Sequence, residues 1–142
     1  MVIGYTTGVF DMFHIGHLNI LKRAKADCDY LIVGISTDEL VKKDKNKLPI
    51  IPYEERAAIV NAIKYVDEVV PQKDKNKLRA YLNMEKRFNK MYVGSDWKNT
   101  EAWNKYEDEF APYGVEIVYL PHTDGISSTI LRKKLKGSYL IG

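Results

Sequence analysis

The sequence predicts an α/β fold, a Rossmann-like doubly wound sheet of about five parallel strands with helices on both faces. Apolar runs alternate five times with segments of helical period, which is typical of parallel strands joined by right-handed crossovers. The run 30–35 is apolar throughout, as expected for a strand that is covered on both faces. A length of 142 residues, 45% of them hydrophobic, suits a single domain spanning 1–142.

The first half of the chain is expected to supply two strands and three helices. We predict a strand over Val2–Thr6, a helix over His17–Ala26 and a strand over Tyr30–Ile35. Ser36–Glu39 begins a short helix, and a lysine-rich loop follows it. Pro52 then opens a further helix whose first turn is acidic, which the helix dipole favours.

The second half continues the alternation of strands and helices. The expected strands are 68–70, 91–93 and 115–120, and the expected helices are 78–88, 101–110 and 127–135. Ligands of such sheets bind beyond the carboxyl ends of the strands, where most of the motifs described below fall.

Charge and hydropathy narrow the possible partners. The net charge of +3 is compatible with an anionic small molecule but lacks the strong basic stripe of a nucleic-acid binder. No apolar run approaches the ~20 residues that span a bilayer. No secretion signal is visible at the N-terminus, so we expect a cytoplasmic protein that binds neither nucleic acid nor membrane.

A hexapeptide, Lys-Asp-Lys-Asn-Lys-Leu, occurs at 43–48 and again at 73–78. Repeat architectures need several stacked units, and the surroundings of the two copies differ. We interpret the repeat as coincidence or local duplication, with no second site implied.

The segment 6–17 (Thr-Thr-Gly-Val-Phe-Asp-Met-Phe-His-Ile-Gly-His) lies between the first strand and the first helix. Gly8 allows a close turn past a ligand, and Gly16 removes a side chain where a phosphate would approach the backbone. His14 and His17 are three residues apart, so their rings should lie on one side of the helix start and donate to phosphate oxygens. They could instead be ordinary polar residues or metal ligands, but zinc sites normally need three or four ligands.

A second candidate anion site is 121–129, Pro-His-Thr-Asp-Gly-Ile-Ser-Ser-Thr, which opens the last expected helix. Ser127 or Ser128 can cap that helix, and free N–H groups at its start attract anions. A simple strand-turn-helix junction with a good cap is the alternative.

Taken together, these motifs resemble the cytidylyltransferase family, and most closely its bacterial members that act on glycerol 3-phosphate. Similar enzymes act on phosphocholine and phosphoethanolamine. The resemblance covers nearly the whole chain, because several spaced motifs occur in the family's order. They are Gly-Val-Phe-Asp-x-x-His-x-Gly-His at 8–17, Ile-Ser-Thr-Asp-Glu at 35–39, Tyr-Glu-x-Arg at 53–56, Tyr-Val-Asp-Glu-Val at 65–69, Gly-Ser-Asp-Trp at 94–97 and Thr-Asp-Gly-Ile-Ser at 123–127.

The resemblance implies roles for individual residues. His14 and His17 would bind the triphosphate and stabilise the transition state, Lys45 or Lys47 would reach phosphates from a mobile loop, and Arg56 would hold phosphates or the acceptor. Most loop lysines could instead be merely solvated, and Arg56 could form a surface salt bridge with a neighbouring Glu. The nucleotide site would comprise Thr7, Gly8, Val9, Phe10, Asp11, Gly16, Gly94, Asp96, Thr123, Gly125, Ile126, Ser127, Ser128 and Thr129.

Two positions depart from the family pattern. His122 stands where the family usually has an arginine before Thr-x-Gly-Ile-Ser, and Lys64 replaces the arginine before Tyr-Val-Asp-Glu-Val. Arginine holds a phosphate with a planar fork, whereas lysine offers a point charge and histidine a conditional one. These two residues and Trp97 are candidates for acceptor binding, so the acceptor is in more doubt than the reaction. Asp96 is equally compatible with a loop cap.

The resemblance implies transfer of CMP from CTP to a small phosphorylated alcohol, with pyrophosphate released. Mg²⁺ would accompany the triphosphate, no residue is predicted to bind a metal by itself, and the enzyme would be a homodimer. Positioning and charge stabilisation would drive an in-line displacement without a covalent intermediate. Two alternatives stay open: an adenylyltransferase of the same superfamily that uses ATP, and a nucleotide-binding module without catalytic activity.

Overall fold

The computed structural model describes residues 1–121 and 134, and within them five parallel strands form one sheet. The strand order is β3-β2-β1-β4-β5. The strands are β1 (Ile3–Gly8), β2 (Tyr30–Ser36), β3 (Glu68–Gln72), β4 (Lys90–Gly94) and β5 (Glu116–Leu120). This arrangement confirms the predicted doubly wound α/β fold.

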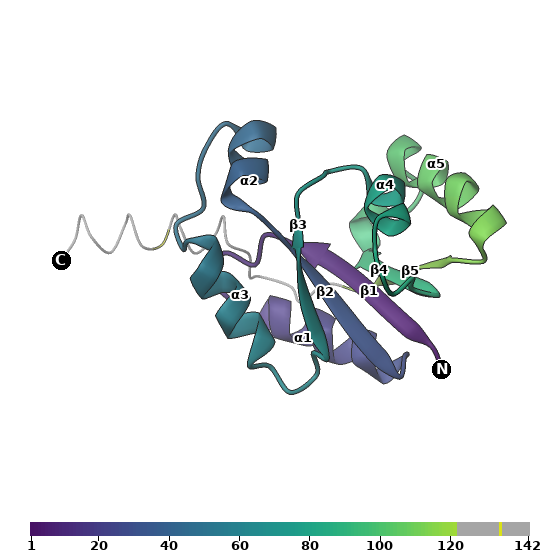
Figure 1. Cartoon of the computed structure of the whole chain (residues 1–142), viewed down its shortest axis with the longest axis horizontal. Coiled ribbons are helices and arrows are strands. Elements are labelled where there is room, and N and C mark those ends of the chain that lie inside the picture. The colour runs from purple at the N-terminus through teal and green to yellow at the C-terminus, as the bar shows by residue number, and fades with distance from the viewer. Residues whose placement is uncertain (122–133, 135–142) are drawn as a thin grey trace.

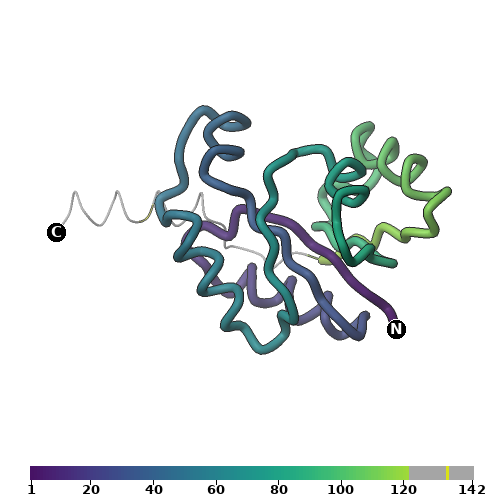
Figure 2. The backbone as a smooth tube through the Cα atoms, in the orientation of Figure 1, coloured from purple at the N-terminus to yellow at the C-terminus, as the bar shows by residue number. Residues whose placement is uncertain are grey.

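Helices cover both faces of the sheet (Figure 1). The chain path in Figure 2 shows α1 (Ile15–Ala26) and α3 (Tyr53–Asn61) on one face, and α4 (Lys77–Leu82) and α5 (Glu101–Phe110) on the other. The short helix α2 (Asp38–Lys45) lies beyond the carboxyl ends of the strands. Two 3₁₀ turns complete the described elements, η1 (Ser95–Trp97) and η2 (Ala111–Tyr113).

Strand β2 is buried on both faces, as its unbroken apolar run predicts. Leu31 and Val33 face the core under α1 and α3, while Ile32 belongs to the core under α4 and α5, and none of the three is exposed to solvent. The second core is aromatic, since the Phe88 ring stacks on Tyr5 with centroids 4.6 Å apart. The central strand pair is therefore fixed from two sides, which gives the loops at its carboxyl edge a rigid base.

One predicted helix is shorter than expected. Instead of running over 78–88, α4 ends at Leu82. The chain then turns back to start β4, and the Asn89 side chain accepts a hydrogen bond from the Ile3 backbone N–H at 2.7 Å. Phe88 is 2% exposed, so its core packing outweighs the helical period of this segment.

The strand order reverses between β1 and β4. The chain first builds outward through β2 and β3, and then crosses to β4 on the other side of β1. In open α/β sheets, this reversal leaves a crevice at the carboxyl ends of the two strands, where ligands bind. In the described part of the chain, no helix is long and apolar enough to cross a membrane.

Candidate active site

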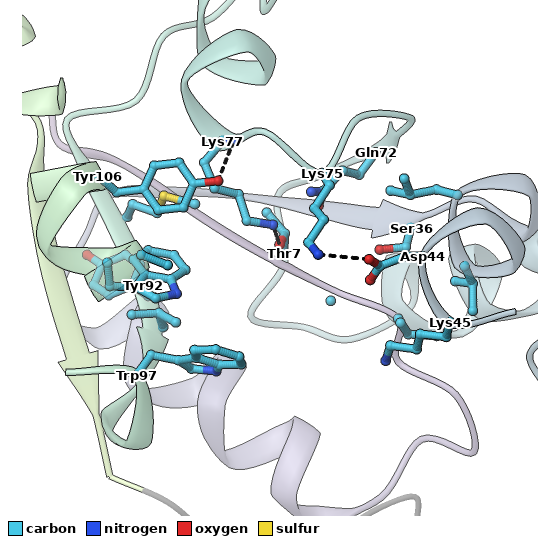
Figure 3. A pocket seen from close by; sticks show the side chains of 18 residues that line it. Thr7, Ser36, Asp44, Lys45, Gln72, Lys75, Lys77, Tyr92, Trp97 and Tyr106 are labelled. Carbon is cyan, nitrogen blue, oxygen red and sulfur yellow. Dashed lines mark hydrogen bonds and ion pairs between the residues drawn. The ribbon is translucent and has the colours of Figure 1, made fainter. Parts of the chain in front are cut away.

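A cavity of about 510 Å³ opens at the carboxyl edge of the sheet. Figure 3 shows Trp97 and Tyr106 on one side of it and Asp44 and Lys45 on the opposite side. The ends of β1 to β4 and the turns that follow them supply most of the wall, with contributions from α2 and α5. Among the lining residues are Thr7, Gly8, Val9, Ser36, Asp44, Lys45, Gln72, Lys75, Lys77, Val93, Trp97, Trp103 and Tyr106.

The two histidines of the first motif lie together at the start of α1, as predicted. Their rings stack with centroids 3.8 Å apart and an angle of 24° between the planes. His14 is the N-cap, and its Nδ1 accepts a hydrogen bond from the Gly16 backbone N–H at 3.0 Å. Nδ1 of His17 accepts one from the His14 backbone N–H at 3.2 Å. The pair therefore caps its own helix.

These two bonds set the tautomer of each ring. A backbone N–H can only donate, so both Nδ1 atoms act as acceptors, and in a neutral ring the proton is then on Nε2. Burial, with a smaller effect of His14, lowers the pKa of His17 to about 4, and burial also lowers the pKa of His14. Both imidazoles are therefore neutral at pH 7, and among the described residues each Nε2–H has no acceptor.

The helix start offers less backbone to a phosphate than the sequence predicts. The Gly16 N–H already donates to His14, and Leu18 N–H donates to the His14 carbonyl at 3.1 Å. Gly8 lines the cavity, and a Cβ added there would lie 3.0 Å from the Phe10 ring, so the position has no room for a larger residue. Phe10 itself is 7% exposed, has a φ of 55° and packs against His17, so it supports the histidine from the core.

Arg56 does not lie at the surface, as the salt-bridge alternative assumed, nor does it line the cavity. It is 1% exposed, and its guanidinium pairs with Asp38 at 2.6 Å. Its other hydrogen bonds go to the carbonyls of Ile51, Val9 and Ser36 at 2.8, 2.6 and 2.9 Å. Four donated bonds within the protein make Arg56 a clamp on the loops, so the predicted direct role in holding a phosphate needs correction.

Asp11 reinforces the same clamp. Its side chain is buried, and its two carboxylate oxygens accept hydrogen bonds from the backbone N–H groups of Ile50 and Ile51 at 2.8 and 2.9 Å. Together Arg56 and Asp11 tie the turn after β1 to the segment before α3. Asp11 was predicted to belong to the nucleotide site, and in the structure its carboxylate holds the backbone of the segment before α3.

The lysines expected in a mobile loop are placed differently from one another. Lys45 is the last residue of α2 and lines the cavity, because the helix continues until Asn46 takes a left-handed conformation with φ 56°. Lys47 follows the helix, is exposed and does not line this cavity. Only the first of the two candidates therefore borders the cavity.

Lys77, at the start of α4, is a site residue that the sequence motifs did not indicate. Its Nζ donates to Thr7 Oγ1 at 3.0 Å across 70 residues of sequence. Burial, and then the neighbouring charge of Lys75, lower its pKa to about 8. Within the described part of the chain, the Lys77 ammonium is desolvated, bonded to a single hydroxyl and adjacent to a cavity, which suits an anionic ligand.

Both copies of the hexapeptide border this cavity. Lys75 from the second copy pairs with Asp44 from the first, with Nζ and Oδ1 2.8 Å apart (Figure 3). We call Lys45, Lys75 and Lys77 together with Asp44 the lysine cluster. The repeat is thus relevant to the site, because α2 ends and α4 begins at neighbouring points on the carboxyl edge.

Comparison with known proteins assigns the chain to a family. The profile of the Cytidylyltransferase-like family matches residues 5–134. The chain belongs to this family. It is 37% identical to the glycerol-3-phosphate cytidylyltransferase of Bacillus subtilis (strain 168), over 93% of this chain and 95% of that protein. The enzyme of the same name from Bacillus spizizenii is 40% identical, over 92% of this chain and 94% of the relative.

A solved structure from Thermoplasma volcanium GSS1, described as a lipopolysaccharide core biosynthesis protein, shares the fold of this cytidylyltransferase-like chain. The TM-score is 0.70 at 24% identity, with 87% of this chain and 97% of that chain covered. At that identity, the likeness supports the fold alone.

Within the cytidylyltransferase-like chain, the candidate acceptor residues are not all brought together. Trp97 is half exposed and lines the cavity, whereas Gly94 and Asp96, which precede it in the turn after β4, are not among the lining residues. Lys64 lies between α3 and β3, at the opposite, amino edge of the sheet, with its Nζ over the Tyr65 ring at 5.2 Å. A crossover helix must return the chain to that edge before the next parallel strand, so Lys64 is not part of the cavity of its own chain.

The remaining predictions of this cytidylyltransferase-like site fall outside the described residues. They concern His122, Thr123, Gly125, Ile126, Ser127, Ser128 and Thr129, and most of the expected helix 127–135. Within residues 1–121 and 134, no group of three His, Cys, Asp or Glu side chains is placed to hold a metal ion.

Proposed function

We propose that this chain transfers CMP from CTP to a small phosphorylated alcohol and releases pyrophosphate. The observation that carries the proposal is the stacked His14–His17 pair at the carboxyl edge of the sheet, two neutral imidazoles whose Nε2–H groups have no acceptor among residues 1–121 and 134. The names and coverage of the relatives support the same activity, and they favour CTP over ATP.

In the proposed reaction, an oxygen of the acceptor phosphate attacks the α-phosphorus of CTP. A new P–O bond forms, and the bond from the α-phosphorus to the oxygen that bridges to the β-phosphorus breaks. The electron pair leaves with pyrophosphate. The acceptor oxygen is already deprotonated, because a phosphate monoester has its second pKa near ~6, so no general base is required.

The histidines would act on the charge that develops in this step. Their Nε2–H groups would donate to the phosphoryl oxygens of CTP, and the bonds would strengthen as negative charge builds on those oxygens. Because the caps hold both rings in place before substrate binds, little reorganisation is needed during the reaction.

The lysine cluster is proposed to receive the acceptor phosphate. Lys77 is partly desolvated and donates a hydrogen bond to Thr7. Lys75 forms an ion pair with Asp44 across the cavity. An arriving phosphate dianion would restore charge balance around Lys77. Mg²⁺ is proposed to enter as part of the substrate, bound to the triphosphate.

A homodimer forms part of the proposal. Three apolar side chains that are more than half exposed, Ile15, Leu48 and Ile50, support it. They lie on segments that the Asp11 bond to Ile50 ties together. Size-exclusion chromatography with light scattering should give twice the mass of the chain. A monomeric mass at micromolar concentration contradicts this part.

The central experiment measures pyrophosphate release with Mg²⁺–CTP and a panel of phosphorylated acceptors: glycerol 3-phosphate, phosphoethanolamine and phosphocholine. We expect turnover with at least one of them, and weaker turnover when ATP replaces CTP. Preference for ATP would establish the adenylyltransferase alternative. Binding of CTP without release of pyrophosphate with any acceptor would contradict the proposed activity.

A further inference from the structure

Gln72, the last residue of β3, is one of the residues that line the cavity, and one polar atom of its buried side chain has no hydrogen-bond partner among the described residues. Its side chain is 3% exposed. The Nε2 donates to the Asp74 carbonyl at 3.1 Å, while Oε1 is buried and has no hydrogen-bond partner among the described residues. A buried acceptor without a donor is costly, and native proteins rarely retain one without a reason.

The bond to Asp74 also fixes which end of the amide lacks a partner. A carbonyl oxygen can only accept, so Nε2 must face Asp74, and Oε1 must point away from it. The ligand group that would complete this pairing is therefore a hydrogen-bond donor.

The charges around the cavity decide what kind of donor fits. Lys45, Lys75 and Lys77 line it, and the one carboxylate among the described lining residues is Asp44, already paired with Lys75. This excess of positive charge favours a phosphate and disfavours an ammonium group on the ligand. A neutral hydroxyl is the donor that remains.

Gln72 and Lys77 stand at the two ends of the turn that joins β3 to α4, and both are seen at the cavity in Figure 3. One small molecule that carries a phosphate and a hydroxyl can engage both residues. We propose that Gln72 is a specificity-determining residue of this site, whose Oε1 accepts a hydrogen bond from a hydroxyl on the carbon chain of the acceptor. This inference rests on the proposed function.

The inference is tested with acceptors of similar size that carry different hydrogen-bond donors. Glycerol 3-phosphate offers hydroxyls, n-propyl phosphate offers none, and phosphoethanolamine offers an ammonium group. For the unmodified protein, we expect kcat/KM to fall by about 10-fold to 100-fold when the hydroxyls are removed, the usual effect of leaving a buried acceptor unpaired. We expect phosphoethanolamine to be at least as poor.

Substituting Gln72 should abolish that discrimination. In Gln72→Leu, the ratio of kcat/KM for glycerol 3-phosphate over propyl phosphate should approach one. A loss of folding or of general activity lowers both constants and leaves their ratio unchanged, so the ratio reports the hydroxyl contact alone. Asn83→Ala removes an exposed amide at the end of α4, outside the cavity, and should leave the ratio at the unmodified value.

Gln72→Glu provides a second variant should the leucine substitution fail to fold. Its carboxylate keeps an acceptor oxygen and adds negative charge, so glycerol 3-phosphate should stay preferred over propyl phosphate, while phosphoethanolamine should gain relative to both. Ratios unchanged in both Gln72 variants, with turnover intact, would overturn the role of Gln72 and leave the proposed function standing. No pyrophosphate release with any acceptor would instead reject the proposed function itself.

Discussion

The start of α1 and the lysine cluster both lie at the carboxyl edge of the sheet, but they are built in different ways, and neither His14 nor His17 is among the residues that line the cavity. The histidine pair is local: two rings three residues apart are held by bonds to backbone groups of the same turn. The lysine cluster is assembled from distant segments, with contacts across 31 residues for Asp44 and Lys75 and 70 residues for Thr7 and Lys77. The local region is organised by its own helix, whereas the cluster depends on how the whole sheet arranges its loops.

Arg56→Ala should break both regions at once, and it is the largest effect we expect. The substitution removes the Arg56 donors from the Val9, Ser36 and Ile51 carbonyls and the cationic partner from Oδ1 of Asp38. We expect a loss of about 3 kcal/mol or more in the free energy of unfolding, measured by urea denaturation.

Arg56→Lys serves as the matched variant for this clamp, because it keeps the charge but not the planar fork. It should recover only part of the lost stability. Full activity and stability in Arg56→Ala would show that the clamp is unnecessary.

His17→Ala tests the local region on its own. It removes one Nε2–H donor and one cap acceptor, so kcat for pyrophosphate release should fall by about 10²-fold to 10³-fold. The KM for the acceptor should change little. Lys22→Ala, an exposed change on the same helix, should leave kcat unaltered. Activity of His17→Ala within a few-fold of normal would remove the role assigned to this ring.

Lys77→Met tests the distant region. Without its ammonium, the KM for the acceptor should rise by about 10-fold, the effect of one lost charge-assisted bond, while the KM for CTP should change far less. Lys73→Met, an exposed lysine in the same hexapeptide copy, should behave like the unmodified protein. An equal rise in KM for CTP and for the acceptor would show that the lysine cluster does not bind the acceptor selectively.

The same variant should be more stable at neutral pH. Burial lowers the pKa of Lys77 from 10.5 to about 8, so folding opposes its protonation. The penalty is present below pH 8 and fades as the pH rises toward 10.5, where the unfolded chain also loses the proton. Because the side chain is partly solvated, we expect Lys77→Met to gain only about 1 kcal/mol at pH 7.

The sequence predicts the features of this molecule that depend on local patterns, but not those that depend on contacts between distant segments. The alternation of strands and helices predicted the sheet, and the spacing of His14 and His17 predicted that their rings meet, because both patterns are local. Phe88 was predicted to be helical because its period fits, but its contact with Tyr5 comes from a strand at the other end of the chain.

Lys77 and Gln72 could not be recognised in the same way. A lysine in a charged hexapeptide resembles a solvated residue until the fold places Thr7 beside it, and a lone glutamine carries no spacing signal. Arg56 was expected at a phosphate because the motif contains an arginine. Its burial, which assigns it to the clamp, depends on three loops that meet only in the folded chain.

The decrease of folding stability at acidic pH should contain a contribution from His17. The pKa of His17 lies near 4 in the folded protein, against 6.5 for an unperturbed ring. Between pH 6.5 and 4 the unfolded chain therefore binds more protons, and stability falls as the pH falls. The full shift corresponds to at most about 3 kcal/mol. Chemical denaturation at pH 7 and pH 4.5 should show a smaller loss in His17→Ala than in the unmodified protein.

The proposed role of His14 and His17 requires both rings to be neutral donors with protons on Nε2. Two-dimensional ¹H–¹⁵N NMR of the imidazole nitrogens, recorded from pH 4 to pH 8, measures the tautomer and the titration of each ring. We predict unprotonated Nδ1 and protonated Nε2 on both rings at pH 7, with the pKa of His17 near 4. A proton on Nδ1, or titration of His17 near its unperturbed value of 6.5, would contradict the account.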